Sequence, residues 1–111
     1  MHLTAMIDKE LVAATSTALV LSILIEGDSY GYEIIQRVLK LTNAELRWTD
    51  SMLYPVLHRL EKKGWGSSYW QASPTGRKRK YYSVSDEGMD ELEERKRQWR
   101  IADDALTSLW E

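Results

Sequence analysis

Apolar residues recur every three or four positions between about residues 8 and 26, which predicts a first helix. Its apolar stripe consists of Leu11, Ala14, Ala18, Leu21 and Ile25. Further apolar residues between positions 20 and 24 widen this stripe, so we expect the helix to be buried on more than one side. Gly27 suits the end of the helix, and Asp28 or Ser29 can cap the start of the next one.

The same spacing predicts a second helix over about residues 30–41. Its apolar face consists of Ile34, Ile35, Val38, Leu39 and Leu41. A glycine inside a helix costs roughly 1 kcal/mol relative to alanine. We therefore interpret Gly31, in the first turn, as a point of close approach to another backbone or to a phosphate chain.

A third helix is predicted to begin near Thr49 or Asp50, which are both good N-cap residues, and to end at Gly64. Its inward residues are Leu53, Val56, Leu57 and Leu60. Pro55 lies past the first turn, where proline removes a backbone hydrogen bond. On spacing alone, either the helix begins later or its first part is bent.

Two short runs rich in tyrosine and tryptophan, residues 65–73 and 79–84, flank the turn-forming sequence Pro-Thr-Gly and predict a β-hairpin. Adjacent strand residues point to opposite faces, so one of Tyr81 and Tyr82 should pack inward while the other lies outward with the neighbouring cations. The alternative is that both rings anchor the hairpin.

Ser85 is predicted to cap a last helix over about residues 86–110. Glu91–Arg95 and Glu93–Arg97 have the spacing of stabilising ion pairs. A narrow heptad-like seam runs along the helix, interrupted by Arg95, and a helix of this kind needs another surface to lie on. The seam consists of Leu92, Trp99, Ala102, Leu106 and Leu109.

The order helix, helix, helix, hairpin, helix predicts a mainly α fold with a small β-hairpin, and the 111-residue length fits one compact unit. Helices two and three suit a helix-turn-helix, and the hairpin suits the wing of a winged helix. We therefore expect a winged helix-turn-helix DNA-binding domain over residues 1–85 and a C-terminal dimerisation helix over residues 86–111.

The charge distribution favours an anionic partner. Between Arg59 and Lys80 there are seven cations and one acid, whereas the rest of the chain holds eight cations and sixteen acids, for a net charge of −2. A positive block on an acidic background directs the field of the protein to one face. Nucleic acid is the natural partner, and a solvated charged loop is the alternative reading.

The composition provides no basis for a catalytic or metal site. The chain has no cysteine, and His58 is accompanied only by His2, so we expect no metal and no cofactor. We find no histidine–carboxylate pair near a serine and no phosphate-binding glycine loop, so we do not expect an enzyme. With no apolar run of about 18 residues and no evident secretory signal, we expect a cytoplasmic protein.

Three motifs, "GDSYGYEI", "SMLYPVLHRLEKKGW" and "GRKRKYYSVSDEG", occur in the order and spacing of PadR-family transcriptional regulators, and the chain resembles that family from about Leu11 to Gly88. Val84-Ser85 stands where Leu-Thr is usual. The single short C-terminal helix resembles the smaller members. The resemblance places Pro55 inside the recognition helix.

The resemblance implies a homodimeric repressor that binds an inverted-repeat operator and responds to small aromatic effectors. It also implies that one site binds several different drugs. It implies bases near Ser51, Met52 and His58 and backbone phosphate near Tyr54. The DNA-binding residues expected on these grounds are Tyr32, Thr49, Ser51, Met52, Tyr54, His58, Arg59, Lys62, Arg77, Lys78, Arg79 and Lys80. The alternative function is a winged-helix protein-interaction module that does not bind DNA.

Trp99 has two readings, as a side chain of the dimer core or as half of an indole pair that sandwiches a planar ligand between subunits. The resemblance to the small members of the family implies a ligand site of the second kind. In that reading Asp103 favours a cationic ligand. The first helix lines the walls through Leu11, Thr17, Ala18 and Leu21.

Overall fold

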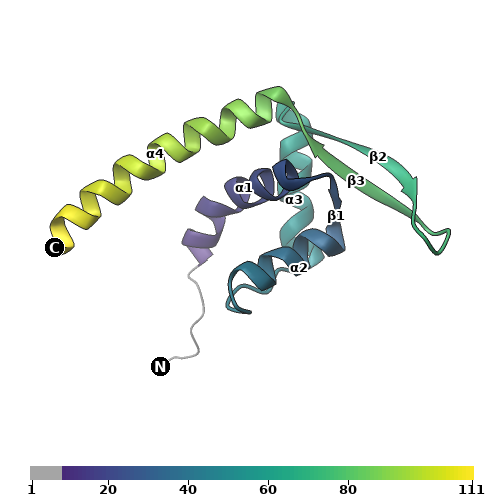
Figure 1. Ribbon diagram of the computed structural model, residues 1–111, viewed down its shortest axis with the longest axis horizontal. Coiled ribbons are helices and arrows are strands. Elements are labelled where there is room, and N and C mark those ends of the chain that lie inside the picture. The colour runs from purple at the N-terminus through teal and green to yellow at the C-terminus, as the bar shows by residue number, and fades with distance from the viewer. Residues whose placement is uncertain (1–8) are drawn as a thin grey trace.

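The computed structural model describes residues 9–111 as three packed helices from which a β-hairpin and a long fourth helix project in opposite directions (Figure 1). The elements are α1 (Lys9–Glu26), β1 (Ser29–Tyr30), α2 (Gly31–Leu41), α3 (Asp50–Lys63), β2 (Gly66–Ala72), β3 (Lys78–Val84) and α4 (Asp86–Trp110). This architecture confirms the predicted fold class. The predicted helix start at Asp8 and the N-terminal stretch used for the localisation prediction lie outside the described residues.

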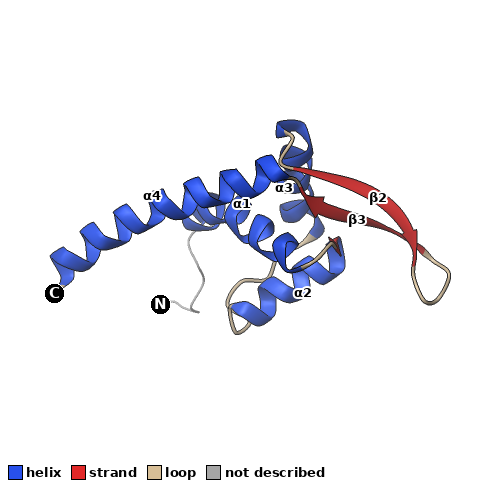
Figure 2. Ribbon diagram, turned by 45° about the horizontal axis from the view of Figure 1, so that its top comes forward, coloured by secondary structure: helices blue, strands red, loops and turns tan. Residues whose placement is uncertain are grey.

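The strands form one antiparallel sheet in the order β1-β3-β2, with the hairpin extending beyond the helices (Figure 2). β1 pairs Ser29 with Tyr82 and Tyr30 with Tyr81. The sequence gives no sign of β1, because two residues are too few to show the alternation of a strand. This strand ties the α1–α2 connection to the base of the wing.

The core lies between α1, α2 and α3 and is closed by one residue from the sheet and one from α4. All four predicted inward residues of α3 are buried, as are Ile34 and Val38 of α2. The fully buried side chains are Val20, Leu21, Leu24, Ile34, Val38, Leu53, Leu57 and Leu60. Tyr82 and Leu92 close this core from the sheet and from α4.

The predicted stripe of α1 is wrong at its two ends, because Leu11 and Ile25 are 47% and 46% exposed. α1 packs on two sides, and the predicted stripe combines residues from both of them. One side faces the core with Val20, Leu21 and Leu24, while Ala18 faces a groove toward α4. The expectation that α1 is buried on more than one side is therefore correct, whereas the assignment of its core face is not.

Helix ends follow the predictions in position but not always in capping chemistry. Ser85 caps α4, since its Oγ accepts a hydrogen bond from the Gly88 amide at 3.0 Å. Thr49 holds the N-cap position of α3, but its hydroxyl contacts Ser51 Oγ instead of a backbone amide. Neither Asp28 nor Ser29 caps α2, because β1 continues to Tyr30 and places that residue at the N-cap.

Pro55 lies inside α3, in its second turn, and the helix begins at Asp50. The late start that spacing alone left open is therefore excluded. The side chain of Pro55 is exposed, on the side of α3 opposite the core. The proline consequently interrupts a backbone hydrogen bond on the solvent side without disturbing the packing of Leu53, Val56 and Leu57.

The first half of α4 packs against the three-helix unit, and its second half does not. Leu92 is buried, but every residue from Lys96 onward is exposed in the single chain. The predicted Glu91–Arg95 ion pair is present, with Nε and Oε2 2.7 Å apart. The predicted Glu93–Arg97 pair is wrong, because Arg97 pairs with Glu94 and Lys96 pairs with Glu93 at the closer i,i+3 spacing. In the part of the chain described here, no helix is long and apolar enough to cross a membrane.

Candidate nucleic-acid interface

The outer side of α3 presents a line of exposed residues directly opposite its core residues. Successive helix residues are turned by about 100°, so Ser51, Pro55, His58 and Lys62 fall on one line along the helix. All four are exposed. Three of them, Ser51, His58 and Lys62, are residues that the sequence predicts to contact DNA.

One flank of α3, carrying Tyr54 and Glu61, faces α2 and the wing. The Oε2 atom of Glu61 accepts a hydrogen bond of 2.8 Å from Ser68 Oγ on β2. A Cβ atom on Gly31 would lie 2.8 Å from Tyr54 Oη. Gly31 is thus a point of close approach, as predicted, and its neighbour within the protein is a tyrosine hydroxyl and not a backbone. This contact holds the first turn of α2 beside α3.

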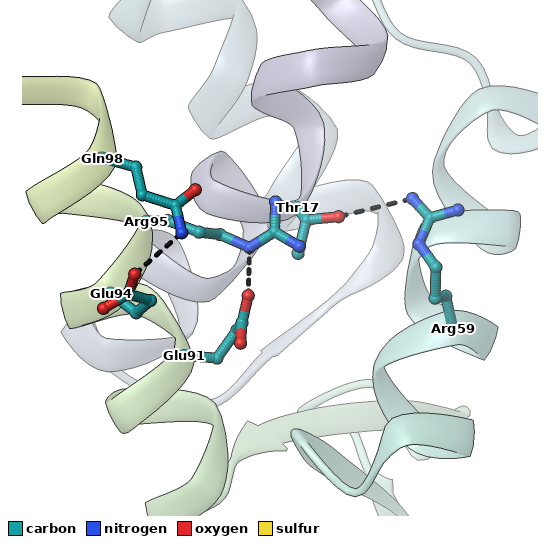
Figure 3. A network of polar contacts seen from close by, with 6 residues as sticks. All are labelled: Thr17, Arg59, Glu91, Glu94, Arg95 and Gln98. Carbon is teal, nitrogen blue, oxygen red and sulfur yellow. Dashed lines mark hydrogen bonds and ion pairs between the residues drawn. The ribbon is translucent and has the colours of Figure 1, made fainter. Parts of the chain in front are cut away.

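The opposite flank of α3 faces α1. Arg59 Nη2 donates a hydrogen bond of 3.3 Å to Thr17 Oγ1, which Figure 3 shows reaching from α3 across to α1. Thr17 is itself buried. Met52 lies on the same flank and is exposed. Arg59 is therefore a predicted DNA contact on α3 whose side chain is tied to another helix of the protein.

The N-terminus of α2 adds a second group of donors. Tyr32 is exposed in the first turn, and the N-cap residue Tyr30 makes no side-chain capping bond. The free amides of a helix N-terminus are suited to an anion such as a phosphate group. Tyr54 Oη lies beside this turn through its contact with Gly31.

The four-cation run of the wing is divided between the two faces of the hairpin. Lys78 and Lys80 share a face with Tyr82, whose ring packs into the core, and the Lys80 ammonium lies 5.7 Å from the centre of that ring. Arg79 points to the other face, with its guanidinium carbon 4.4 Å from the centre of the Tyr30 ring. Arg77 is exposed in the turn before β3.

A row of tyrosines fastens the outer face of the sheet. Tyr30 and Tyr81 meet edge to face with centroids 5.3 Å apart, and Tyr81 stacks on Tyr69 at 5.8 Å. Tyr69 Oη donates a 2.7 Å hydrogen bond to Asp28, and this bond raises the pKa of the Tyr69 phenol. Tyr82 packs inward and Tyr81 lies on the opposite face, as predicted, but Tyr81 is half-buried between two tyrosines, so both rings anchor the hairpin, as the alternative reading has it.

A groove of about 490 Å³ lies between α1 and α4. Its lining includes two of the predicted effector residues, Ala18 and Trp99. Thr17 and Leu21 lie instead in the core, and neither Leu11 nor Asp103 is part of the lining. The lining consists of Ala14, Thr15, Ala18, Leu19, Ser22, Leu92, Arg95, Lys96, Gln98, Trp99, Arg100 and Ala102.

The charge of this groove differs from the expectation. Its charged lining residues are Arg95, Lys96 and Arg100, all cationic. Arg95 is held by Glu91, as Figure 3 shows. Within the described residues, no group of three or more histidine, cysteine, aspartate or glutamate side chains is arranged to hold a metal ion.

Several structural residues escaped prediction. Trp65 lies between the cations Lys63 and Arg95, with centroid distances of 5.9 and 5.4 Å, and so joins the end of α3 to α4. Gly88 packs so closely on Trp65 that a Cβ atom would lie 2.1 Å from its carbonyl oxygen. Both residues belong to motifs that the sequence shows, but their contact is seen only in the folded chain, where the turn between α3 and β2 brings them together.

Comparisons with known proteins agree with this geometry. Residues 20–94 match the model of the transcriptional regulator PadR-like family. A protein of Lysinibacillus sphaericus, uncharacterized protein X, is 33% identical over 94 residues, which cover 85% of this chain and 86% of that protein.

Solved structures of transcriptional regulators share the whole arrangement. A transcriptional regulator from Clostridium thermocellum superposes with a TM-score of 0.82 at 30% identity, covering 90% of this chain and 97% of the other. A PadR-like regulator from Bacillus cereus gives 0.81 at 27% identity, covering 93% and 98%. A PadR-family regulator from Eggerthella lenta gives 0.76 at 35% identity, covering 92% and 87%. Proteins of this family are DNA-binding transcriptional regulators and not enzymes, and on these matches the chain belongs to the PadR-like family of transcriptional regulators.

Proposed function

We propose that this regulator is a homodimeric repressor that binds an inverted-repeat operator and is released by a planar aromatic effector. One observation carries the proposal. The chain exposes both the outer side of α3, with cations nearby, and, at the far end of α4, an apolar stripe that none of the described residues covers. The first feature fits a DNA groove, and the second fits another copy of the same chain.

For DNA recognition, the exposed line of α3 enters the major groove, which admits an α-helix. Ser51, Met52 and His58 reach toward base edges, and Thr49 and Lys62 lie at the two ends of this reading surface. The phosphate contacts fall to the wing and to the junction of α2 and α3. These phosphate-binding residues are Tyr32, Tyr54, Lys62, Arg77, Lys78 and Lys80.

Arg59 and Arg79 act differently in this proposal, although the sequence groups them with the phosphate contacts. Arg59 is held by Thr17, and Arg79 lies over Tyr30. Their role is to fix α3 and the wing relative to α1 and β1. This positioning matters because bases are read only when the recognition helix sits at the correct depth and angle.

For dimerisation, the second half of α4 supplies the interface, so that residues 86–111 serve as the dimerisation helix. Trp99, Leu106 and Trp110 fall within a narrow sector of the helix, and Ala102 and Leu109 border it. Leu92 is already buried in its own chain and anchors α4 instead of meeting the partner. A two-fold axis makes the interface self-complementary and sets the two recognition helices for an inverted repeat.

For effector binding, the groove between α1 and α4 carries Trp99, which is 57% exposed in the single chain. A two-fold partner brings a second indole toward it, so that a flat aromatic molecule stacks between them. Asp103 lies outside the lining of the groove in one chain, whereas three cations line it. The proposal therefore rests on stacking and makes no use of a cationic ligand.

Duplex binding at several salt concentrations tests the DNA-binding role. Replacing Lys78 and Lys80 by alanine should weaken binding to the upstream region of its own gene and to random DNA alike. The slope of log affinity against log salt should fall by about 2, because two phosphate contacts are lost. His58→Ala should instead alter sequence preference, by about 1–3 kcal/mol at one base pair. The opposite pattern would contradict the assigned roles.

Tryptophan emission tests the effector site. Adding a planar aromatic dye should quench emission in the parent and much less in Trp99→Ala, because the stacked indole is gone. Trp70→Phe, a variant remote from the groove, is the matched control and should lose only its own contribution. Equal quenching of the parent and of Trp99→Ala would remove the stacking site from the proposal.

A further inference from the structure

The most exposed large aromatic side chain of the wing is Trp70, on β2. It is 65% exposed. In the sheet register Trp70 stands directly opposite Lys80, and Ala72, the next residue on the same face, stands opposite Lys78. Since strand residues two apart share a face, the indole lies on one face of the hairpin with the ammonium groups of Lys78 and Lys80.

This face of the hairpin continues the surface of α3. Closer to the base of the wing, the same row holds Ser68, which donates to Glu61 of α3, and Tyr82, which is buried in the core. Gly66, earlier in the row, packs on Leu60 of α3. Trp70 is two residues beyond Ser68 and therefore roughly 7 Å farther out along the strand. The indole thus lies farther out along the wing, on the face that contacts α3 at its base.

The two faces of the wing treat their aromatic side chains differently. On the outer face, Tyr69 is stacked on Tyr81 and bonded to Asp28. Among the residues that the structure describes, Trp70 makes no ring stack, and the nearby Lys80 ammonium lies over Tyr82 instead. The outer aromatic row is thus satisfied within the chain, whereas the indole facing the α3 side is not.

We propose that Trp70 is a DNA contact, laying its indole on the sugar edge of the backbone next to the groove that α3 reads, while Lys78 and Lys80 hold the adjacent phosphates. The inference rests on the proposed function and adds to it an uncharged contact. Charge decides the occupant: a protein surface covering Trp70 would also have to desolvate two ammonium groups, whereas a duplex offers phosphate to both.

The choice of DNA backbone over bases follows from position. α3 occupies the major groove, so a side chain outside its flank meets the neighbouring strand of sugar and phosphate. An indole has one nitrogen donor and a large apolar surface, which suits the apolar edge of deoxyribose. The contact therefore strengthens binding without selecting a sequence.

Affinity measurements with Trp70→Ala and Trp70→Phe test this assignment. Trp70→Ala should weaken binding about tenfold for the gene's own upstream duplex and for a random duplex of equal length. Because the indole is uncharged, the salt slope should stay unchanged, whereas Lys80→Ala should lower it by about 1. Trp70→Phe should recover part of the affinity. Gln71→Ala, on the opposite face of β2, is the matched control and should bind as the parent does.

Acrylamide quenching gives an independent readout. The parent should lose accessible tryptophan emission when DNA is added, and Trp70→Phe should show a smaller loss. Two results overturn the inference and leave the repressor proposal standing. One is a Trp70→Ala protein that binds DNA as tightly as the parent does. The other is an indole that becomes shielded from acrylamide as the protein concentration rises without DNA. A parent that binds neither duplex overturns the repressor proposal itself.

Discussion

The three-helix unit and the second half of α4 carry similar apolar residues, but these are buried in the first region and exposed in the second. Leu57 of α3 is 0% exposed, whereas Leu109 of α4 is 81% exposed. Both residues lie on stripes with helical spacing, and the sequence pattern alone does not distinguish them. The three-helix unit, called the head below, therefore buries its apolar stripes within one chain, whereas the apolar stripe of the second half of α4 stays exposed.

The exposed half of α4 also differs in what holds it. In the head, helices are held by burial of apolar side chains, the dominant source of stability in folded proteins. In α4, Glu93 pairs with Lys96 and Glu94 pairs with Arg97 along the helix itself. Such exposed pairs contribute only a few tenths of a kcal/mol each. The second half of α4 is thus the less stable region of the chain.

The largest expected effect comes from a substitution in the buried core of the three-helix unit. Leu57→Ala should lower the free energy of unfolding by about 2–5 kcal/mol, because it leaves a cavity in a fully packed core. Urea unfolding followed by circular dichroism, on protein dilute enough to be monomeric, measures the change.

Leu109→Ala is the matched control for Leu57→Ala, since it makes the same substitution at an exposed site. In dilute protein it should change the unfolding free energy by less than about 0.5 kcal/mol. At higher concentration it should weaken self-association, as sedimentation would show. Equal destabilisation by the two substitutions in the monomer would erase the contrast between the regions.

The second effect lies at the joint between the regions. A Cβ atom on Gly88 would lie 2.1 Å from the carbonyl oxygen of Trp65, so alanine there must push α4 away from the head. We expect Gly88→Ala to cost about 1–3 kcal/mol, the range for overpacking a tight site.

The functional consequence of Gly88→Ala sharpens the comparison further. If α4 joins two copies as proposed, it sets the distance between their α3 helices, so the variant should lose more affinity for an inverted repeat than for a single half-site. Duplexes with one and two half-sites measure the ratio. Met89→Ala, one residue on and exposed, should leave both affinities and stability unchanged. A Gly88→Ala protein of parental stability would contradict the close packing.

The helices of the three-helix unit were predictable from sequence where a single helical spacing of apolar residues determines which side chains are buried. α3 followed its spacing closely, because Leu53 and Leu57 face a single core. α1 was harder, since it packs on two sides and its apolar residues serve both. Of the predicted effector wall on α1, Ala18 lines the groove, whereas Thr17 and Leu21 are buried away from it.

The wing shows a different limit of prediction. The cation run was visible, but its division between faces depends on the register that pairs Trp70 with Lys80 and Tyr69 with Tyr81. That register is set by Tyr82 entering the core and by β1 pairing at the edge. Neither is a local property of the sequence, so the engagement of Arg79 with Tyr30 could not be read in advance.

The smallest expected effect concerns the ion pairs that support α4 on its own. The hydrogen bonds from Arg97 and then from Gln98 lower the pKa of Glu94 from its ordinary 4.5 to about 2. A carboxyl group with a lowered pKa stabilises the folded state above its ordinary pKa, and this contribution is lost as the pH falls from about 4.5 toward 2. Because Glu94 is exposed, the contribution to stability is small.

Titration of the Glu94 carboxyl by carbon-13 NMR measures this directly. Arg97→Gln should move its pKa back toward 4.5, and Gln98→Ala should move it less, since Arg97 is the larger cause. Performed on dilute monomer, the titration also reports whether the uncovered half of α4 is helical by itself, because the pair forms only when residues 94 and 97 share a helical face. A parental pKa near 4.5 in the monomer, falling as the dimer forms, would mean that the partner orders this half of α4. The contrast would then be between a folded head and a segment that folds on association.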